Sequence, residues 1–172
     1  MIDNKWFNSQ YGSPPIQLST PKILERKIIN PKTSTLFVLD SIQSNYYVEL
    51  FFEKKDESES NREKENNLIG EEKAQQILDE TIGRYQNQGA VNILVDAENF
   101  ETPSGLPTLK ISGTLDYPKG NENKMVRCFF TTIIIDYDKG KVSLTLIYNK
   151  NDRYGDDISN RIINSIELIK EL

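Results

Sequence analysis

The densest apolar sequence of the chain lies in its last third, Val126 to Leu172. The pattern predicts a strand over Val126–Asp136, a turn at Asp138-Lys139-Gly140, a second strand over Lys141–Tyr148 and an amphipathic helix over Asp156–Leu172. Both alternating faces of 128–135 are largely apolar, which is typical of a central strand that is covered on both sides. We therefore expect the core of the fold to be built around this last third.

The length of the turn decides the register of the predicted hairpin. A three-residue loop with Gly140 in the left-handed conformation sets Ile134 opposite Leu144. A two-residue turn at Lys139-Gly140 moves the register by one residue and exchanges the faces. We expect the three-residue loop, because it pairs apolar residues with apolar residues.

The sequence before Val126 predicts a second helix and several strands. Residues 70–88 carry apolar side chains at steps of three and four, with acidic residues in the first turn and Gly89 as a C-terminal cap. Gly113 lies inside a predicted strand and indicates a bulge or a close approach of the overlying helix. Strands are expected at 16–18, 36–39, 46–52, 90–97 and 109–115.

One domain is expected from residues 16–172, because the chain shows no internal repeat and no linker that divides it. Residues 1–15 read as an extended N-terminal arm that ends in the turn signal Gly12-Ser13-Pro14-Pro15. Residues 54–67 contain no apolar side chain and are interpreted as a solvated, charged loop insertion. Several strands and two amphipathic helices, each with one apolar stripe, indicate an α+β fold in which the helices pack on a sheet.

The composition excludes several classes of function but does not identify the function. The 172 residues are 37% hydrophobic and 27% charged, as in a soluble globular protein. A net charge of −5 argues against nucleic-acid binding, which requires a basic surface, and no apolar run is long enough to span a membrane. The polar opening residues do not read as a signal peptide. Two compartments stay open: the cytoplasm, or the cell envelope or exterior after removal of a leader peptide.

Candidate chemistry is sparse. The chain contains no histidine, and Cys128 is its single cysteine, which fits a small buried side chain. Asp136 and Asp138 at the predicted turn, with Asp156 and Asp157 at the helix start, are the only weak candidates for metal ligands. Their spacing matches no calcium loop, and turn and helix-start chemistry explain all four. We assign no catalytic residue, cofactor or metal site.

Three motifs resemble the PsbP-like family, which includes the Mog-type Ran-binding proteins. They are Ile16-Gln17-Leu18-Ser19-Thr20-Pro21, the run from Gly105-Leu106-Pro107 to Thr114, and the closing Ile158–Ile169 segment. The resemblance covers most of the chain from Ile16 onward. It implies an α/β/α sandwich, in which a central antiparallel sheet carries helices on both faces, as well as an accessory role in binding a partner and no enzymatic activity.

The leading hypothesis is a non-enzymatic accessory or adaptor protein that binds another protein through a sheet face or edge, as a monomer or weak dimer. One alternative is a carrier of a small apolar ligand, with a pocket between sheet and helix lined by Phe130 and Tyr148. Another is an acidic inhibitor or immunity protein that binds a basic toxin.

Overall fold

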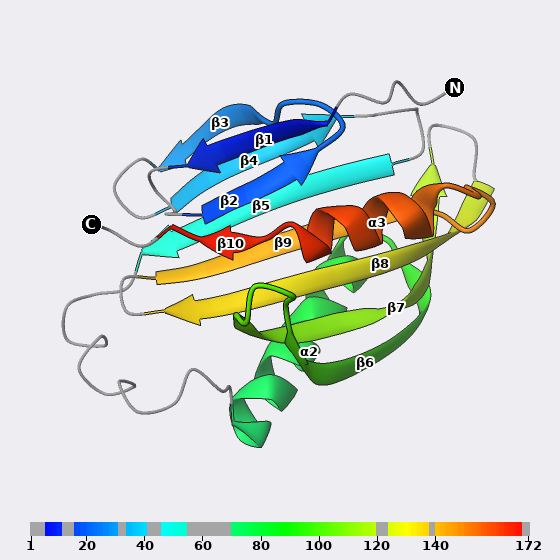
Figure 1. Cartoon of the computed structure of the whole chain (residues 1–172). Coiled ribbons are helices and arrows are strands. Elements are labelled where there is room, and N and C mark those ends of the chain that lie inside the picture. Colours follow the sequence, from blue (N-terminus) through cyan, green and yellow to red (C-terminus); the bar gives the residue numbers. More distant parts are fainter. Residues whose placement is uncertain are drawn as a thin grey trace.

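The computed structural model describes residues 6–11, 16–30, 34–40, 46–54, 70–119, 124–137 and 140–169 (Figure 1). The predicted turn residues Asp138 and Lys139 lie outside the described residues. The same is true of 55–67 of the charged loop, and of residues 1–5 and 12–15 of the expected N-terminal arm. In the described part, no helix is both long and apolar enough to cross a membrane.

The described strands form two antiparallel sheets. A seven-stranded sheet has the order β3-β4-β5-β9-β8-β7-β6, and a three-stranded sheet has the order β1-β2-β10. The strands of the large sheet are β3 (Glu25–Asn30), β4 (Ser34–Asp40), β5 (Tyr46–Lys54), β6 (Val91–Glu101), β7 (Pro107–Lys119), β8 (Lys124–Tyr137) and β9 (Gly140–Asn149). Those of the small sheet are β1 (Phe7–Tyr11), β2 (Ile16–Thr20) and β10 (Glu167–Leu168).

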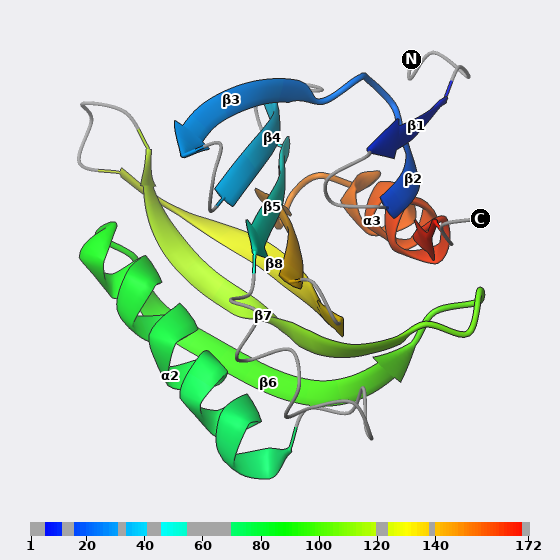
Figure 2. The same cartoon turned by 90° about the vertical axis from the view of Figure 1, so that its left-hand side faces the viewer.

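Strand β8 carries apolar side chains on both faces, and each face belongs to a different core cluster. Cys128, Phe130 and Ile134 pack with helix α2 (Glu71–Asn87), while Ile133 and Ile135 pack with helix α3 (Gly155–Asn164). Figure 2 shows α2 on one side of the large sheet, with α3, β1 and β2 on the other. The α+β class with a central antiparallel sheet is confirmed.

The layer on the α3 side is built differently from the expected long helix. Helix α3 ends at Asn164, although the apolar stripe of the sequence predicted helix to Leu172. The Ser165 hydroxyl accepts a hydrogen bond from the backbone N–H of Ser19 at 2.8 Å, and β10 then pairs with β2. Pairing with a distant strand thus replaces the last helical turns, and Ile166 is still fully buried.

The predicted register of the β8–β9 hairpin was wrong. Tyr137 lies opposite Gly140, so Ile134 faces Ser143 and Ile133 faces Leu144. Because β8 is apolar on both faces, its pattern accepts either register, and β9 still directs its own apolar face toward α3. Gly140 is required for space, since a Cβ there would lie 2.5 Å from the Glu53 carbonyl oxygen on β5.

Gly113 lies beside a bulge, but the bulge is in the neighbouring strand β6, and the close approach also comes from that strand. The register between β6 and β7 shifts between Val91 and Leu94, where Asn92 adopts a φ of 54°. A Cβ at Gly113 would lie 1.9 Å from the Leu94 carbonyl oxygen, so the β6 backbone and not α2 closes over this glycine. The bulge sets the course of the edge strand β6.

Candidate functional site

Of the four aspartates considered as metal ligands, the three that the structure describes do not form one cluster. Asp136 lies 3.1 Å from the ammonium group of Lys73 on α2, and its side chain is almost buried. Asp156 accepts a hydrogen bond from the Tyr148 hydroxyl, and Asp157 is exposed on α3. Asp138 lies outside the described residues.

Strand β9 separates the two ends at which these carboxylates lie. Asp136 is opposite Lys141 at one end of β9, and Tyr148 holds Asp156 at the other. Seven steps along an extended strand span about 23 Å, so Asp136 and Asp156 cannot share an ion. In the described residues, no group of three or more Cys, Asp or Glu side chains could hold a metal ion.

The pocket expected between Phe130 and Tyr148 was wrong, because these rings lie on opposite faces of the sheet. Phe130 packs against Tyr85 of α2 with ring centroids 5.0 Å apart. Tyr148 packs against Phe129 at 5.7 Å, in the cluster under α3. Phe130 lies opposite Ile147, the neighbour of Tyr148, and consecutive strand residues point to opposite faces.

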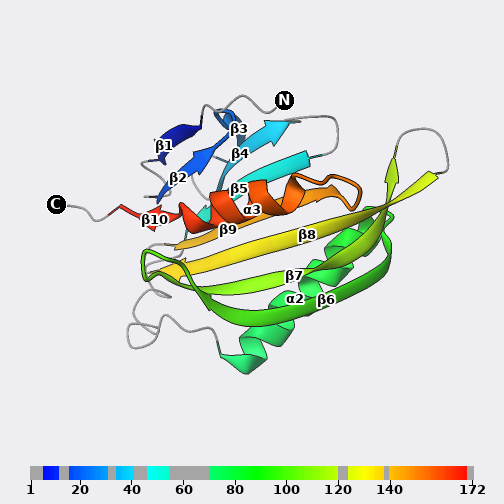
Figure 3. The same ribbon diagram turned by 45° about the vertical axis from the view of Figure 1, so that its right-hand side comes forward.

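A group of exposed apolar side chains lies near the end of the large sheet where β7 and β8 are connected. The side chains of Leu94, Val91 and Met125 are 70%, 47% and 44% exposed, although all three are large and apolar. They come from β6 and β8, the two strands that flank β7. Figures 1 and 3 show this end of the β7–β8 hairpin projecting beyond the body of the molecule.

Strand register places these residues on consecutive rows. Arg127 lies opposite Asp116, which lies opposite Val91; Phe129 lies opposite Thr114, which lies opposite Leu94. Met125 is two residues before Arg127 on the same face of β8. We call this surface the hairpin face, defined as Val91, Leu94, Thr114, Asp116, Met125, Arg127 and Phe129.

A hydrogen-bonded polar group lies at the centre of the hairpin face. Arg127 Nε donates to Asp116 Oδ1 at 3.0 Å, and the Asn92 amide donates to Asp116 Oδ2 at 2.8 Å. The hydrogen bond from Arg127 lowers the pKa of Asp116, and the same bond raises the pKa of Arg127. Both groups therefore stay charged at neutral pH, and Arg127 lies between Met125 and Phe129 on the same face of β8.

The hairpin face combines side chains that are enriched at protein interfaces. Methionine, arginine and aromatic residues are over-represented there, and Met125, Arg127 and Phe129 supply one of each. Tyr154, an exposed aromatic residue, follows the loop whose Lys150 N–H donates a hydrogen bond to the Arg127 carbonyl. The arrangement offers contact and fixed hydrogen bonding rather than a reacting group.

Sequence reasoning predicted three of these strand segments but ended them too early, because Asp116 and Met125 lie on β7 and β8 beyond the predicted strands 109–115 and 126–136. Ile93, Leu94 and Val95 are consecutive apolar residues on an edge strand, so one of them must point away from α2. Figure 1 shows α3 lying along β9, whereas β6 and β7 extend past it. Leu94 is exposed because the layer that would cover it ends before β6.

Comparison with known proteins gave no match to any family model and none to a curated protein. Among solved structures, the chain is similar to a mutant of protein Mog1, with 10% identity, coverage of 96% of this chain and 97% of that one, and a TM-score of 0.49. It is similar to the Ran-binding protein Mog1p of Saccharomyces cerevisiae, with 10% identity, 96% coverage of each chain and a TM-score of 0.49. It is also similar to LpqN, involved in cell envelope biogenesis of Mycobacterium tuberculosis, with 13% identity, coverage of 96% and 91%, and a TM-score of 0.43.

Proposed function

We propose that this protein is a non-enzymatic accessory protein that binds another protein through the hairpin face. The observation that carries the proposal is the exposure of Leu94, Val91 and Met125 around the Arg127–Asp116 pair. Isolated exposed apolar residues are common on soluble proteins, but a group that shares one face of a sheet marks an interaction surface.

A protein partner fits this surface better than a small ligand does. The exposed apolar side chains come from β6 and β8, on either side of β7, and stay in contact with water. Only a surface of similar breadth removes all of them from water together. Burying a side chain such as Leu94 or Met125 contributes about 1–2 kcal/mol, so these residues supply part of the binding free energy of such a complex.

The test compares three single lysine variants as baits for affinity capture from cells that produce the protein. Leu94→Lys and Met125→Lys place a charge on the hairpin face. Gln76→Lys makes the same change of charge on an exposed position of α2, where Glu80 is one turn away. We expect the wild type and Gln76→Lys to recover a partner that both hairpin-face variants lose.

Two results would count against the proposal. One is a partner retained equally by all three variants, and the other is the absence of any specific partner of the wild type. The dependence of binding on salt concentration distinguishes an apolar interface from the acidic-inhibitor alternative. Binding through the hairpin face depends weakly on ionic strength, whereas steering of a basic toxin by the net negative charge weakens steeply as salt is added.

A further inference from the structure

The edge strands of the two sheets differ in charge. Edge strands expose unpaired backbone N–H and C=O groups, and proteins protect them with charged residues against pairing with another chain. Strand β3 carries Glu25, Arg26 and Lys27, β6 carries Asp96, Glu98 and Glu101, and the two-residue β10 carries Glu167. Strand β1, with the sequence Phe-Asn-Ser-Gln-Tyr, is the one edge strand in the described part without a charged residue.

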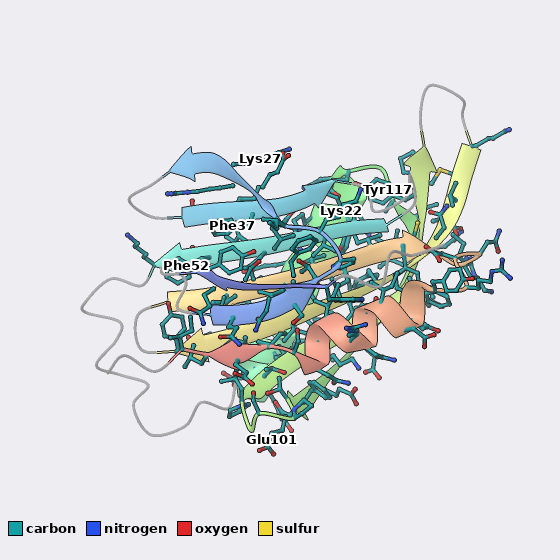
Figure 4. The ribbon with its side chains drawn as sticks, turned by 45° about the horizontal axis from the view of Figure 1, so that its top comes forward. Lys22, Lys27, Phe37, Phe52, Glu101 and Tyr117 are labelled. Atoms are coloured by element: carbon teal, nitrogen blue, oxygen red, sulfur yellow. The ribbon has the colours of Figure 1, made fainter. Side chains whose placement is uncertain are left out.

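Strand β1 is firmly attached on one side and open on the other. It pairs with β2 along all five of its residues, from Phe7 opposite Thr20 to Tyr11 opposite Ile16. The Tyr11 ring packs on Phe37 of β4 with centroids 4.5 Å apart, and Figure 4 shows Phe37 within the large sheet. Figures 2 and 3 show β1 at the outer rim, separated from α3 by β2. This order leaves one edge of β1 without a strand among the described residues.

We propose that β1 pairs with β1 of a second copy of the chain, antiparallel and centred on Ser9. This two-fold arrangement joins the small sheets of the two copies into one six-stranded sheet. It sets Phe7 of each copy opposite Tyr11 of the other, and Asn8 opposite Gln10. The inference is independent of the function proposed for the hairpin face.

The sequence of β1 is complementary to itself in this register. The aromatic residues meet on the face that packs toward the core, and the amides meet on the outer face, where Gln10 already donates to Gln17 at 2.9 Å. Phe7 is 41% exposed although it shares the inward face with buried Tyr11, so the neighbouring Tyr11 of a second copy covers it. No like-charged residues oppose each other along the seam.

A charge-exchange experiment on the full chain tests both the surface and the register. The Asn8→Lys/Gln10→Lys variant places like charges opposite each other at two symmetric positions of the proposed pairing. The matched Asn8→Lys/Gln10→Glu variant changes the same residues but places opposite charges there. Analytical ultracentrifugation over a range of protein concentrations measures dimerisation, and circular dichroism checks that both variants are folded.

We expect a concentration-dependent dimer for the wild type and for the lysine–glutamate variant. The double-lysine variant should dimerise about tenfold more weakly or worse, because like charges directly opposite each other destabilise antiparallel pairs. It carries less net negative charge than the wild type, so general repulsion between copies works against this result and cannot produce it.

Several outcomes would overturn the proposal. A wild type that stays monomeric up to its solubility limit excludes the dimer, and equal weakening of both double variants excludes the antiparallel register around Ser9. Hydrogen exchange of the wild type gives a measurement that needs no variant. Exchange of the β1 amides should slow as protein concentration rises, and an exchange rate independent of concentration contradicts pairing at this edge.

Discussion

The Tyr85 hydroxyl is a buried polar group that has no hydrogen-bond partner in the described part of the chain. Its side chain is 2% exposed, between α2 and the sheet, with its ring against Phe130. A buried hydroxyl without a partner costs about 1–3 kcal/mol, because it loses water and gains no bond in exchange. Burial of the ring stabilises the folded protein, whereas burial of the hydroxyl without a partner destabilises it.

The Tyr85→Phe variant should therefore be more stable than the wild type. We expect its free energy of unfolding at neutral pH to rise by about 1 kcal/mol, measured by urea denaturation. Tyr154→Phe, which removes a hydroxyl from an exposed ring, is the control and should change little. A loss of stability in Tyr85→Phe would show that the hydroxyl is bonded in solution.

The same residue predicts how stability depends on alkaline pH. Burial raises the pKa of Tyr85 to about 12 from its ordinary value of 10.0, and nearby Arg84 opposes part of that rise. The folded protein therefore holds this proton more tightly than the unfolded chain. The resulting stability is complete below the unfolded pKa and is lost as pH rises from about 10 to about 12. Tyr85→Phe should remove this part of the alkaline loss, which denaturation at several pH values would detect.

At the scale of elements, two glycines differ in how closely other parts of the chain approach them. Gly113 of β7 lies under the β6 bulge, where an added Cβ meets the Leu94 carbonyl oxygen. Gly83 lies inside α2, and an added Cβ there meets nothing within 4 Å. The same substitution should therefore have opposite effects at the two positions.

We expect Gly113→Ala to destabilise the protein by about 1–3 kcal/mol, because the β6 backbone must move away. Gly83→Ala should stabilise it by about 0.5–1 kcal/mol, since alanine loses less conformational freedom in a helix. Thermal and urea denaturation of both variants measure the difference. Equal effects would mean that the bulge adapts without cost, and that Gly113 does not hold β6 in place.

The elements that sequence predicted well are those whose own side chains decide their structure. Helix α2 matches its apolar stripe, and Gly89 after it has a φ of 91°, as a helix cap requires. The β8–β9 register could not be predicted, because both faces of β8 are apolar. Strand β1 has little alternation of its own and was expected to be part of an extended arm, but it pairs with β2, the next strand along the chain. Leu94 was predicted to lie on a strand, but its exposure could not be predicted, because it depends on how far the layer that contains α3 extends across the sheet.

At the scale of the whole molecule, the hairpin face and the β1 edge lie on separate parts of the fold. The hairpin face belongs to β6, β7 and β8 of the large sheet, and β1 is the outer strand of the small sheet. Figure 2 shows the β7–β8 hairpin end and β1 on opposite sides of the molecule. Substitutions at one surface should therefore leave binding at the other unchanged, because distant sites that share no partners are additive.

This separation predicts a crossed result. The Leu94→Lys variant should dimerise like the wild type in ultracentrifugation, while it loses the captured partner. The Asn8→Lys/Gln10→Lys variant should keep the partner, while it loses the dimer. Loss of both properties in either variant would show that the two surfaces act as one, for example if the partner bound only the dimer. Retention of one property in each variant would establish two surfaces that work independently, since a folding defect would remove both.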